Sequence, residues 1–209
     1  MKFIGLVMAG GKGTRLSAAA EKPMLRVSKT PMVGRVISAL KGSPSVCRVY
    51  VAVSPHTPET KCYALSLSAI SVIDTPGLDY HSDMRHAVRA VGGGRFVVAS
   101  ADLPLLTPAT VEEILGAYEA RGKPSLTVVA PLRLFEEMGL DPTWVLEIGG
   151  GKFVPCGINV VDGAAIDEPY IDESYFVVDD PSLCVNVNTL HDLYLAEKLI
   201  NNRTDNPSY

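Results

Sequence analysis

The residues best suited to chemistry lie near the start of the chain. A short loop contains Ala9, Gly10, Gly11, Gly13, Thr14 and Arg15. Glycine backbone can approach a ligand closely, and converging N–H groups form a concave site for an anion. Arg15 adds a planar cation that matches phosphate oxygens. We therefore predict that this loop binds the phosphates of a nucleotide.

Lys22 is a second cation and stands beside the rigid ring of Pro23. A lysine that follows a glycine-rich loop supplies a point charge to phosphates. In phosphoryl transfer, charge spreads over the transferred group, so catalysis depends mainly on positioning and electrostatic stabilisation. We predict catalytic roles for Lys22, Arg15 and Asp102. The alternative is an ordinary glycine turn with solvated cations.

Asp102 follows an apolar run and precedes Leu103-Pro104. A carboxylate at this place suits a divalent cation, which prefers hard oxygen ligands, and we expect Mg²⁺. Asn188 ends another short apolar segment and could donate an amide oxygen to the same ion. Asn186 would lie on the same face if that segment is extended. The alternative for these residues is turn formation or helix capping.

Other common sites are not indicated. The sequence has neither Gly-x-x-x-x-Gly-Lys-Ser/Thr nor the third glycine of Gly-x-Gly-x-x-Gly. Its four histidines show no metal-ligand spacing. Only His56 is kept as a candidate site residue, as a contact to the base of the nucleotide. Four scattered cysteines without a Cys-x-x-Cys pair favour free thiols over a zinc site or a disulfide scaffold.

Strands and helices alternate along the first 130 residues. Apolar runs predict strands at 3–7, 46–53, 70–73, 96–100 and 126–130, and apolar faces predict helices at 32–40, between 58 and 67, at 80–91 and after a capping Thr107. The later chain predicts a hairpin of strands 144–148 and 153–161, a strand at 175–178 and a last helix after Thr189. We therefore predict an α/β protein with a three-layer α/β/α arrangement, a mostly parallel (mixed) sheet and Rossmann-like topology.

The predicted topology gathers the polar residues. Ligands of open parallel sheets bind beyond the carboxyl ends of the strands. The glycine loop, the turn Ser54-Pro55-His56-Thr57 and Asp102 each follow a predicted strand. We expect these three clusters to converge on one site.

Composition limits the classes of function. The chain has 209 residues, 47% of them hydrophobic and 20% charged, which suits one domain with a sizeable core. A net charge of −4 and the lack of a basic run make nucleic-acid binding unexpected. With no apolar stretch of membrane-spanning length and no secretory signal, we expect no membrane span and a cytoplasmic location.

Several motifs carry a family resemblance. Gly-Gly-x-Gly-Thr-Arg-Leu at 10–16, with Lys-Pro at 22–23, resembles the signature of nucleotidyltransferases of the GT-A-like fold. The segment 102–106, Asp-Leu-Pro-Leu-Leu, is similar to a segment of small guanylyltransferases, including the molybdenum cofactor type. Segments 53–61, 72–77, 154–161 and 186–197 resemble the archaeal GTP:adenosylcobinamide-phosphate guanylyltransferases. The resemblance covers nearly the whole chain.

This resemblance implies transfer of GMP from GTP to adenosylcobinamide phosphate, with magnesium, in a homodimer. It implies a single domain 1–209, with a nucleotide-binding half at 1–130 and an acceptor or dimer half at 131–209. The implied nucleotide contacts are the glycine loop and Lys22, joined by Ser54, Pro55, Thr57, Asp74, Gly157 and Asn159. For Gly157 and Asn159 the resemblance leaves two roles open, a contact to guanosine or a place in the acceptor pocket. The implied metal ligands are Asp102 and Asn188, with Asn186 as a further candidate. Segments 132–143 and 163–174 match nothing that can be assigned.

Other readings remain open. A molybdenum cofactor guanylyltransferase shares the loop and the Asp-x-Pro segment, and a sugar-1-phosphate nucleotidyltransferase usually has more chain beyond the core. From a different class, the chain could be a non-catalytic nucleotide-binding module, although Lys22 and Asp102 argue against it. Turnover with GTP and magnesium would separate the enzyme from the module. Nothing in the composition selects guanine, so that choice depends on the resemblance.

Overall fold

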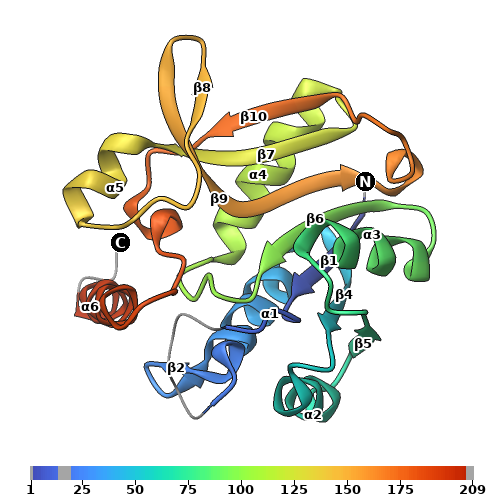
Figure 1. Cartoon of the computed structure of the whole chain (residues 1–209), viewed down its shortest axis with the longest axis horizontal. Helices are drawn as coiled ribbons and strands as arrows, with labels where there is room; N and C mark the ends of the chain where they lie inside the picture. Colours follow the sequence, from blue (N-terminus) through green and yellow to red (C-terminus); the bar gives the residue numbers. More distant parts are fainter. Residues whose placement is uncertain (1, 14–19, 206–209) are drawn as a thin grey trace.

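The structure, a computed structural model, describes residues 2–13 and 20–205 (Figure 1). One sheet of eight strands has the order β10-β7-β9-β6-β1-β4-β5, with β8 paired to β9. Its strands are β1 (Phe3–Met8), β4 (Val46–Val53), β5 (Ile70–Asp74), β6 (Arg95–Ser100), β7 (Ser125–Pro131), β8 (Leu146–Ile148), β9 (Gly151–Asp162) and β10 (Glu173–Val177). A separate small ribbon pairs β2 (Arg26–Val27) with β3 (Thr30–Pro31).

The sheet is mixed and mostly parallel, as predicted. β1 pairs in parallel with β4 and β6, β4 with β5, and β7 with β10. β9 runs antiparallel to β6 on one side and β7 on the other. The predicted hairpin is present as β8 and β9, and it projects from the sheet (Figure 1). Its second strand continues into the centre of the sheet, which the hairpin pattern alone did not indicate.

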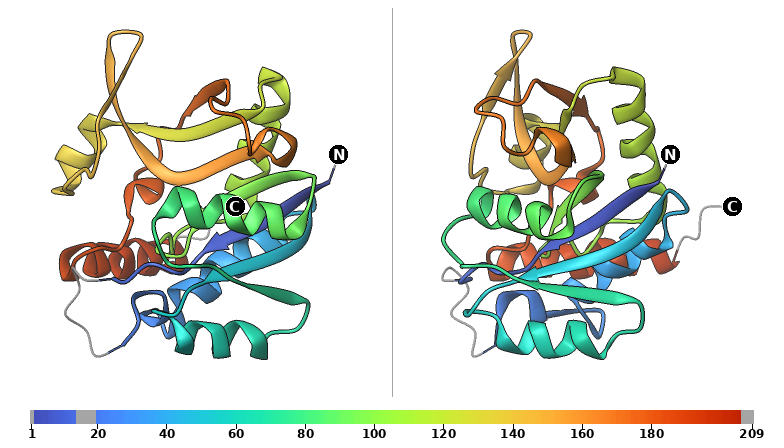
Figure 2. Two further views of the ribbon diagram at one scale, coloured as in Figure 1. Left: turned by 45° about the vertical axis from the view of Figure 1, so that its right-hand side comes forward. Right: turned by 90° about the vertical axis from the view of Figure 1, so that its right-hand side faces the viewer.

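Helices cover both faces of the sheet. They are α1 (Met32–Gly42), α2 (Pro58–Ser66), α3 (Tyr80–Val91), α4 (Pro108–Arg121), α5 (Leu132–Met138) and α6 (Leu190–Asp205), with 3-10 turns η1 (Lys22–Met24), η2 (Gly163–Ala165) and η3 (Pro181–Cys184). α1 and α4 share one buried apolar cluster, whereas α3 packs over a second cluster on the opposite face (Figure 2). The three-layer α/β/α fold is thereby confirmed.

β1 explains how one strand serves both layers. Phe3 and Val7 join the cluster under α1 and α4, while Leu6 and Met8 join the cluster under α3. Successive side chains of a strand point to opposite faces, so a strand buried on both sides must be apolar throughout. This strand is central in the sheet, and the loop that follows it therefore starts from a fixed point.

The two unassigned segments have defined structure. Segment 132–143 begins with α5, whose Leu134 and Phe135 are buried against β7 and β9. Segment 163–174 contains η2 and the first residues of β10, which adds a parallel edge strand to β7. Among the described residues, no helix combines the length and the apolar character needed to cross a membrane.

The contact between α1 and α2 yields a stability prediction. A Cβ added to Gly34 in α1 would lie 2.4 Å from the hydroxyl oxygen of Tyr63 in α2. We expect Gly34→Ala to lower the free energy of unfolding by about 1–3 kcal/mol, the usual scale of overpacking. In a Tyr63→Phe background the same change should cost less by ~1 kcal/mol, because the clashing oxygen is gone. Urea unfolding of the four proteins measures this coupling, and equal costs in both backgrounds would contradict it.

Candidate active site

The glycine loop is fixed against the turn that follows β4. The Ser54 hydroxyl donates to the carbonyl oxygen of Gly10 at 2.6 Å, and the Ser54 backbone N–H donates to Thr57 Oγ1 at 3.1 Å. A Cβ added to Gly10 would lie 3.1 Å from the Ser54 Cβ. Ser54 and Thr57 are both buried. Their polar atoms therefore hold the loop and the turn together.

The two later glycines of the loop, Gly11 and Gly13, differ in the space around them. Gly13 has a φ of +60°, and a Cβ there would lie 2.7 Å from the Cβ of Lys22. A Cβ added to Gly11 would have no described atom within 4 Å, apart from those of Gly11 and its two chain neighbours. Gly13 is thus required by the close approach of Lys22, whereas Gly11 leaves open space beside the cavity. Thr14 and Arg15 lie outside the described residues.

Lys22 lies between two polar side chains from distant segments. Its Nζ is 2.5 Å from Asp102 Oδ2 and 2.8 Å from Asn188 Oδ1. The side chains of Lys22 and Asp102 are 16% and 19% exposed. Attraction between charges strengthens as water is excluded, so this ion pair is stronger than a pair on the open surface. The arrangement places a fixed ammonium beside a carboxylate and an amide oxygen.

The orientation of Asn188 is set by its own neighbours. Its Nδ2 donates to the carbonyl oxygen of Asn186 at 3.1 Å, which turns Oδ1 toward Lys22. The backbone N–H groups of Asn188 and Thr189 donate to Asp192 Oδ2 at 2.7 and 2.8 Å. Asp192 is buried and therefore holds the segment before α6 in one position. The sequence had identified Asn188 but not this support.

The two carboxylate oxygens of Asp102 have different surroundings. Oδ2 is paired with Lys22, whereas Oδ1 is buried and has no hydrogen-bond partner among the described residues. A buried carboxylate oxygen without a partner is costly, and a bound cation would satisfy it. No group of three or more His, Cys, Asp or Glu that could hold a metal exists in the described part of the chain. One carboxylate with amide oxygens fits Mg²⁺, which commonly takes its remaining ligands from water and substrate phosphates.

Glu21 anchors the segment that carries Lys22. Its Oε1 accepts from the backbone N–H of Glu59 at 2.6 Å, and its Oε2 accepts from the N–H and hydroxyl of Thr60 at 2.8 and 2.6 Å. These groups form the first turn of α2, where a carboxylate satisfies free N–H groups and matches the helix dipole. The sequence analysis missed Glu21, because its partners stand 38 and 39 residues away.

A cavity of about 440 Å³ opens between these elements. It is lined by residues 8–13 of the glycine loop, by Lys22 and Asn188, by the ends of β6 at 100–102 and by segment 77–80. The expected convergence of the glycine loop and Asp102 is therefore found. The turn 54–57 reaches this site through Ser54 and Gly10, not through the cavity wall.

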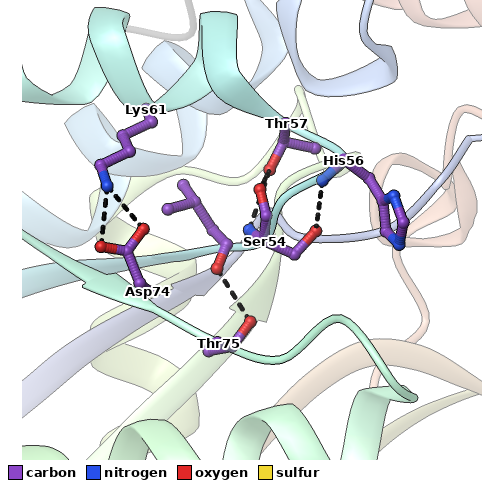
Figure 3. A network of polar contacts seen from close by, with 7 residues as sticks. Ser54, His56, Thr57, Lys61, Asp74 and Thr75 are labelled. Carbon is purple, nitrogen blue, oxygen red and sulfur yellow. Dashed lines mark hydrogen bonds and ion pairs between the residues drawn. The ribbon is translucent and has the colours of Figure 1, made fainter.

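Asp74, a candidate nucleotide contact, does not line the cavity. Its two oxygens each lie 2.7 Å from Nζ of Lys61, and its side chain is 68% exposed (Figure 3). The strand alternation of β5 points it away from the loop. Pro55 and His56 are exposed at the turn after β4. The structure thus gives no support to a nucleotide contact by Asp74.

A second cavity, of about 1060 Å³, adjoins the first. Tyr80, Ser100, Asp102 and Asn188 line both cavities. The second one extends over the face of β9, β7 and β10 to α5 and the β8–β9 hairpin. Its walls include Gly157, Asn159 and Asn186, so these candidates lie beyond Asp102 as seen from the glycine loop.

The period of β9 places Gly157 and Asn159 in this wall. Cys156 and Ile158 are buried in the core, whereas Gly157 and Asn159, which alternate with them along the strand, line the second cavity. Gly157 has a φ of +74°, and a Cβ there would lie 2.8 Å from Asn186 Nδ2. Gly157 therefore lets the Asn186 segment pass close to β9.

Tyr80 stands in the wall between the two cavities. Burial raises the pKa of Tyr80 to about 12, and the nearby negative charge of Asp102 acts in the same direction. The phenol is therefore neutral at neutral pH. Asn159 Nδ2 donates to its oxygen at 3.4 Å. The sequence analysis used Tyr80 only as the start of a helix, because nothing local marks it as a site residue.

Known proteins are similar to this chain in sequence and in fold. Residues 5–138 match the family model described as MobA-like NTP transferase domain. The adenosylcobinamide-phosphate guanylyltransferase of Methanocaldococcus jannaschii is 32% identical, over 93% of this chain and 96% of that protein. The 2-C-methyl-D-erythritol 4-phosphate cytidylyltransferase of Nocardia farcinica is 26% identical, over 96% and 94% of the two chains. The solved structure of CMP:2-keto-3-deoxy-manno-octonic acid synthetase complexed with CTP has a TM-score of 0.77 at 16% identity and covers 97% of this chain and all of that one.

Glu21 provides a test of how Lys22 is positioned. Gln at this position cannot accept at both terminal atoms, so Glu21→Gln should leave one N–H of α2 without its partner. We expect catalytic turnover to fall about tenfold, a loss of ~1.4 kcal/mol in transition-state stabilisation, while nucleotide affinity changes less. Steady-state kinetics and nucleotide titration measure both effects.

The matched control is Glu59→Gln, which removes an exposed carboxylate from the same turn of α2. It should leave turnover unchanged. If Glu21→Gln lowered thermal stability but kept full turnover, Glu21 would only cap the helix and would not position Lys22.

Proposed function

The chain belongs to the family of MobA-like NTP transferase domains and is a nucleotidyltransferase, and from this membership we propose that it transfers GMP from GTP to adenosylcobinamide phosphate. The products are adenosylcobinamide-GDP and pyrophosphate, in a step of cobalamin biosynthesis. The relative named adenosylcobinamide-phosphate guanylyltransferase is similar to this chain along almost the full length of both proteins. Another relative is named a cytidylyltransferase, so the base and the acceptor are the parts of the proposal that need testing.

The observation that carries the proposed chemistry is the position of Lys22. Its ammonium lies beside Asp102 and Asn188, two residues that line both cavities. A donor nucleotide in the smaller cavity and an acceptor in the larger one would meet at this point. A fixed ammonium at the meeting point can stabilise charge that develops only in the transition state.

The proposed reaction is a single displacement. A phosphate oxygen of the acceptor forms a bond to the α-phosphorus of GTP, and the bond from that phosphorus to the bridging oxygen breaks. Pyrophosphate leaves with the electron pair. Lys22, assisted by Arg15, offsets the charge on the α-phosphoryl group and on the leaving pyrophosphate. The glycine loop, with Thr14, holds the phosphates of GTP.

We propose Mg²⁺ as the cofactor. Asp102 would hold it through Oδ1, with Asn188 and Asn186 as the amide candidates. The ion, when bound, supplies positive charge that neutralises the phosphate oxygens. Because Lys22 occupies Oδ2 of the same carboxylate, both cations would share Asp102 without competing for one oxygen.

The size of the second cavity supports a bulky acceptor. Its volume of about 1060 Å³ exceeds that of the first, about 440 Å³. Trp144, 68% exposed, adds a large aromatic ring to its lining, suited to packing on a flat macrocycle. A homodimer and a cytoplasmic location, both expected from the sequence, stay predictions.

The central test is a product assay with several acceptors and donors. With Mg²⁺ present, we expect GTP and adenosylcobinamide phosphate to give adenosylcobinamide-GDP and pyrophosphate. Molybdopterin and sugar 1-phosphates should give no product, ATP, CTP and UTP should be poor donors, and a chelator should abolish turnover. Mass spectrometry identifies the product. Preferred use of molybdopterin would replace this assignment with molybdenum cofactor guanylyltransferase, and nucleotide binding without any turnover would favour a binding module.

Lys22 gives the sharpest test of the mechanism. Lys22→Ala should lower turnover about a hundredfold or more, with a smaller effect on GTP affinity, because the ammonium acts mainly in the transition state. Lys22→Arg should restore activity only in part, because a guanidinium fork cannot occupy the place of a point charge. Steady-state kinetics and calorimetric titration separate the two effects.

Removal of Lys22 also leaves the Asp102 carboxylate without its counter-ion, so folding must be checked by circular dichroism. Lys22→Gln, which can still donate a hydrogen bond to Asp102, serves as the second variant. If Lys22→Ala and Lys22→Gln were folded and retained turnover within about threefold of the wild type, Lys22 would be a structural residue.

A further inference from the structure

The floor of the larger cavity is a polar surface formed by three neighbouring strands. Asn159 on β9 is paired across the sheet with Thr127 on β7, and Thr127 is paired with Tyr175 on β10. Side chains of opposed residues lie on the same face of a sheet. Glu173 lies two residues before Tyr175 and therefore shares this face. All four residues line the cavity.

Hydrogen bonds hold Glu173 in a fixed place. The Thr127 hydroxyl contacts both Glu173 Oε1 and Asn159 Oδ1. The bond to Glu173 raises the pKa of Tyr175 to about 12, which keeps the phenol protonated as a donor to this carboxylate. A carboxylate has about four lone-pair positions, so two donors from the protein leave further positions for a ligand.

The surface has more acceptors than donors. Thr127 has one hydroxyl proton, but two oxygen acceptors, on Glu173 and Asn159, are within reach. One of these two oxygens therefore does not receive the Thr127 proton and is able to accept from a further donor. Such a donor can come from a ligand whose N–H groups face the strands.

Cations are missing from the cavity wall. Among the described residues that line it, none is Lys or Arg, whereas four carry carboxylates: Asp102, Asp141, Glu173 and Asp192. The basic side chains of this wall are His81 and His191, so an anionic group on the body of an acceptor would meet mainly repulsion from the carboxylates. Only the end next to Lys22 suits a phosphate. The cavity is therefore polarised, with a cation at one end and hydrogen-bond acceptors along its floor.

We propose that Glu173, supported by Thr127 and Tyr175, selects acceptors whose body presents N–H donors, namely the carboxamides on the periphery of cobinamide, and rejects acceptors that carry carboxylates there. This inference rests on the proposed function and adds its specificity-determining residue. Discrimination follows because a site built to accept hydrogen bonds leaves buried acceptors unpaired, or facing like charge, when the donor is missing.

The test compares Glu173→Gln with the wild-type enzyme. The change is nearly isosteric. It removes the negative charge that would strengthen hydrogen bonds from the acceptor substrate. We expect KM for adenosylcobinamide phosphate to rise about tenfold, the scale of losing one charge-assisted hydrogen bond. Turnover at saturation and KM for GTP should change less than about twofold, because the residue acts through acceptor binding.

A second measurement uses a corrinoid phosphate in which peripheral carboxamides are hydrolysed to carboxylates. The wild-type enzyme should use it at least about tenfold less efficiently than the amide form. Glu173→Gln should bring the efficiencies with the amide and carboxylate substrates closer together, because the substrate carboxylates are then no longer repelled by a charge at position 173. A purely structural role of Glu173 would lower both efficiencies equally.

Two further variants keep the result clear. Asp172→Asn removes the neighbouring carboxylate, which is paired with Lys123 on the surface at 2.8 Å, and should behave as the wild type. If Glu173→Gln fails to fold, Tyr175→Phe keeps the charge but loosens its support, and should raise KM for the acceptor about threefold. An unchanged acceptor KM and an unchanged amide preference in the folded variants would overturn this inference alone. Absence of turnover of any corrinoid phosphate by the wild-type enzyme would overturn the proposed function and this inference with it.

Discussion

The ion pair between Lys22 and Asp102, with Asn188 beside it, joins three parts of the chain that are far apart in the sequence. Lys22 follows the glycine loop, Asp102 follows β6, and Asn188 precedes α6. A partly buried charge requires its partner, so the loop, the end of β6 and the C-terminal segment must be placed together. The same pair leaves Oδ1 of Asp102 without a partner among the residues that the structure describes. The interaction that orders the site thus leaves this carboxylate oxygen available as an acceptor.

The order of the strands in the sheet places the two cavities next to this ion pair. β1 and β6 are parallel neighbours, so the glycine loop and Asp102 emerge at the same edge of the sheet. β9 lies beyond β6 and runs antiparallel, which lays its residues Gly157 and Asn159 along the second cavity. The two cavities therefore lie side by side and share the wall that contains Asp102. A transfer between two substrates needs this geometry, because the reacting groups must be brought into contact.

Supporting residues act in the same way throughout the site. Glu21 secures the segment of Lys22 on α2, and Asp192 secures that of Asn188 on α6. Ser54 secures the glycine loop on the turn after β4. Each is a short polar contact to backbone or capping groups, and together they reduce the freedom of the groups expected to act. Preorganisation of this kind is what electrostatic catalysis requires.

The sequence by itself determined the local features. Apolar runs identified the strands of the main sheet, spacing identified the α-helices other than α5, and the glycine loop with Lys-Pro identified the family, because each of these signals lies between residues close in the chain. The tertiary structure decided what depends on register and strand order. It turned Asp74 toward Lys61, inserted β9 between β6 and β7, and brought Glu173 to Thr127. Thr127 and Glu173 are separated by 46 residues, and no local pattern encodes such a contact. It exists only once the strands are paired, because pairing sets which side chains share a face.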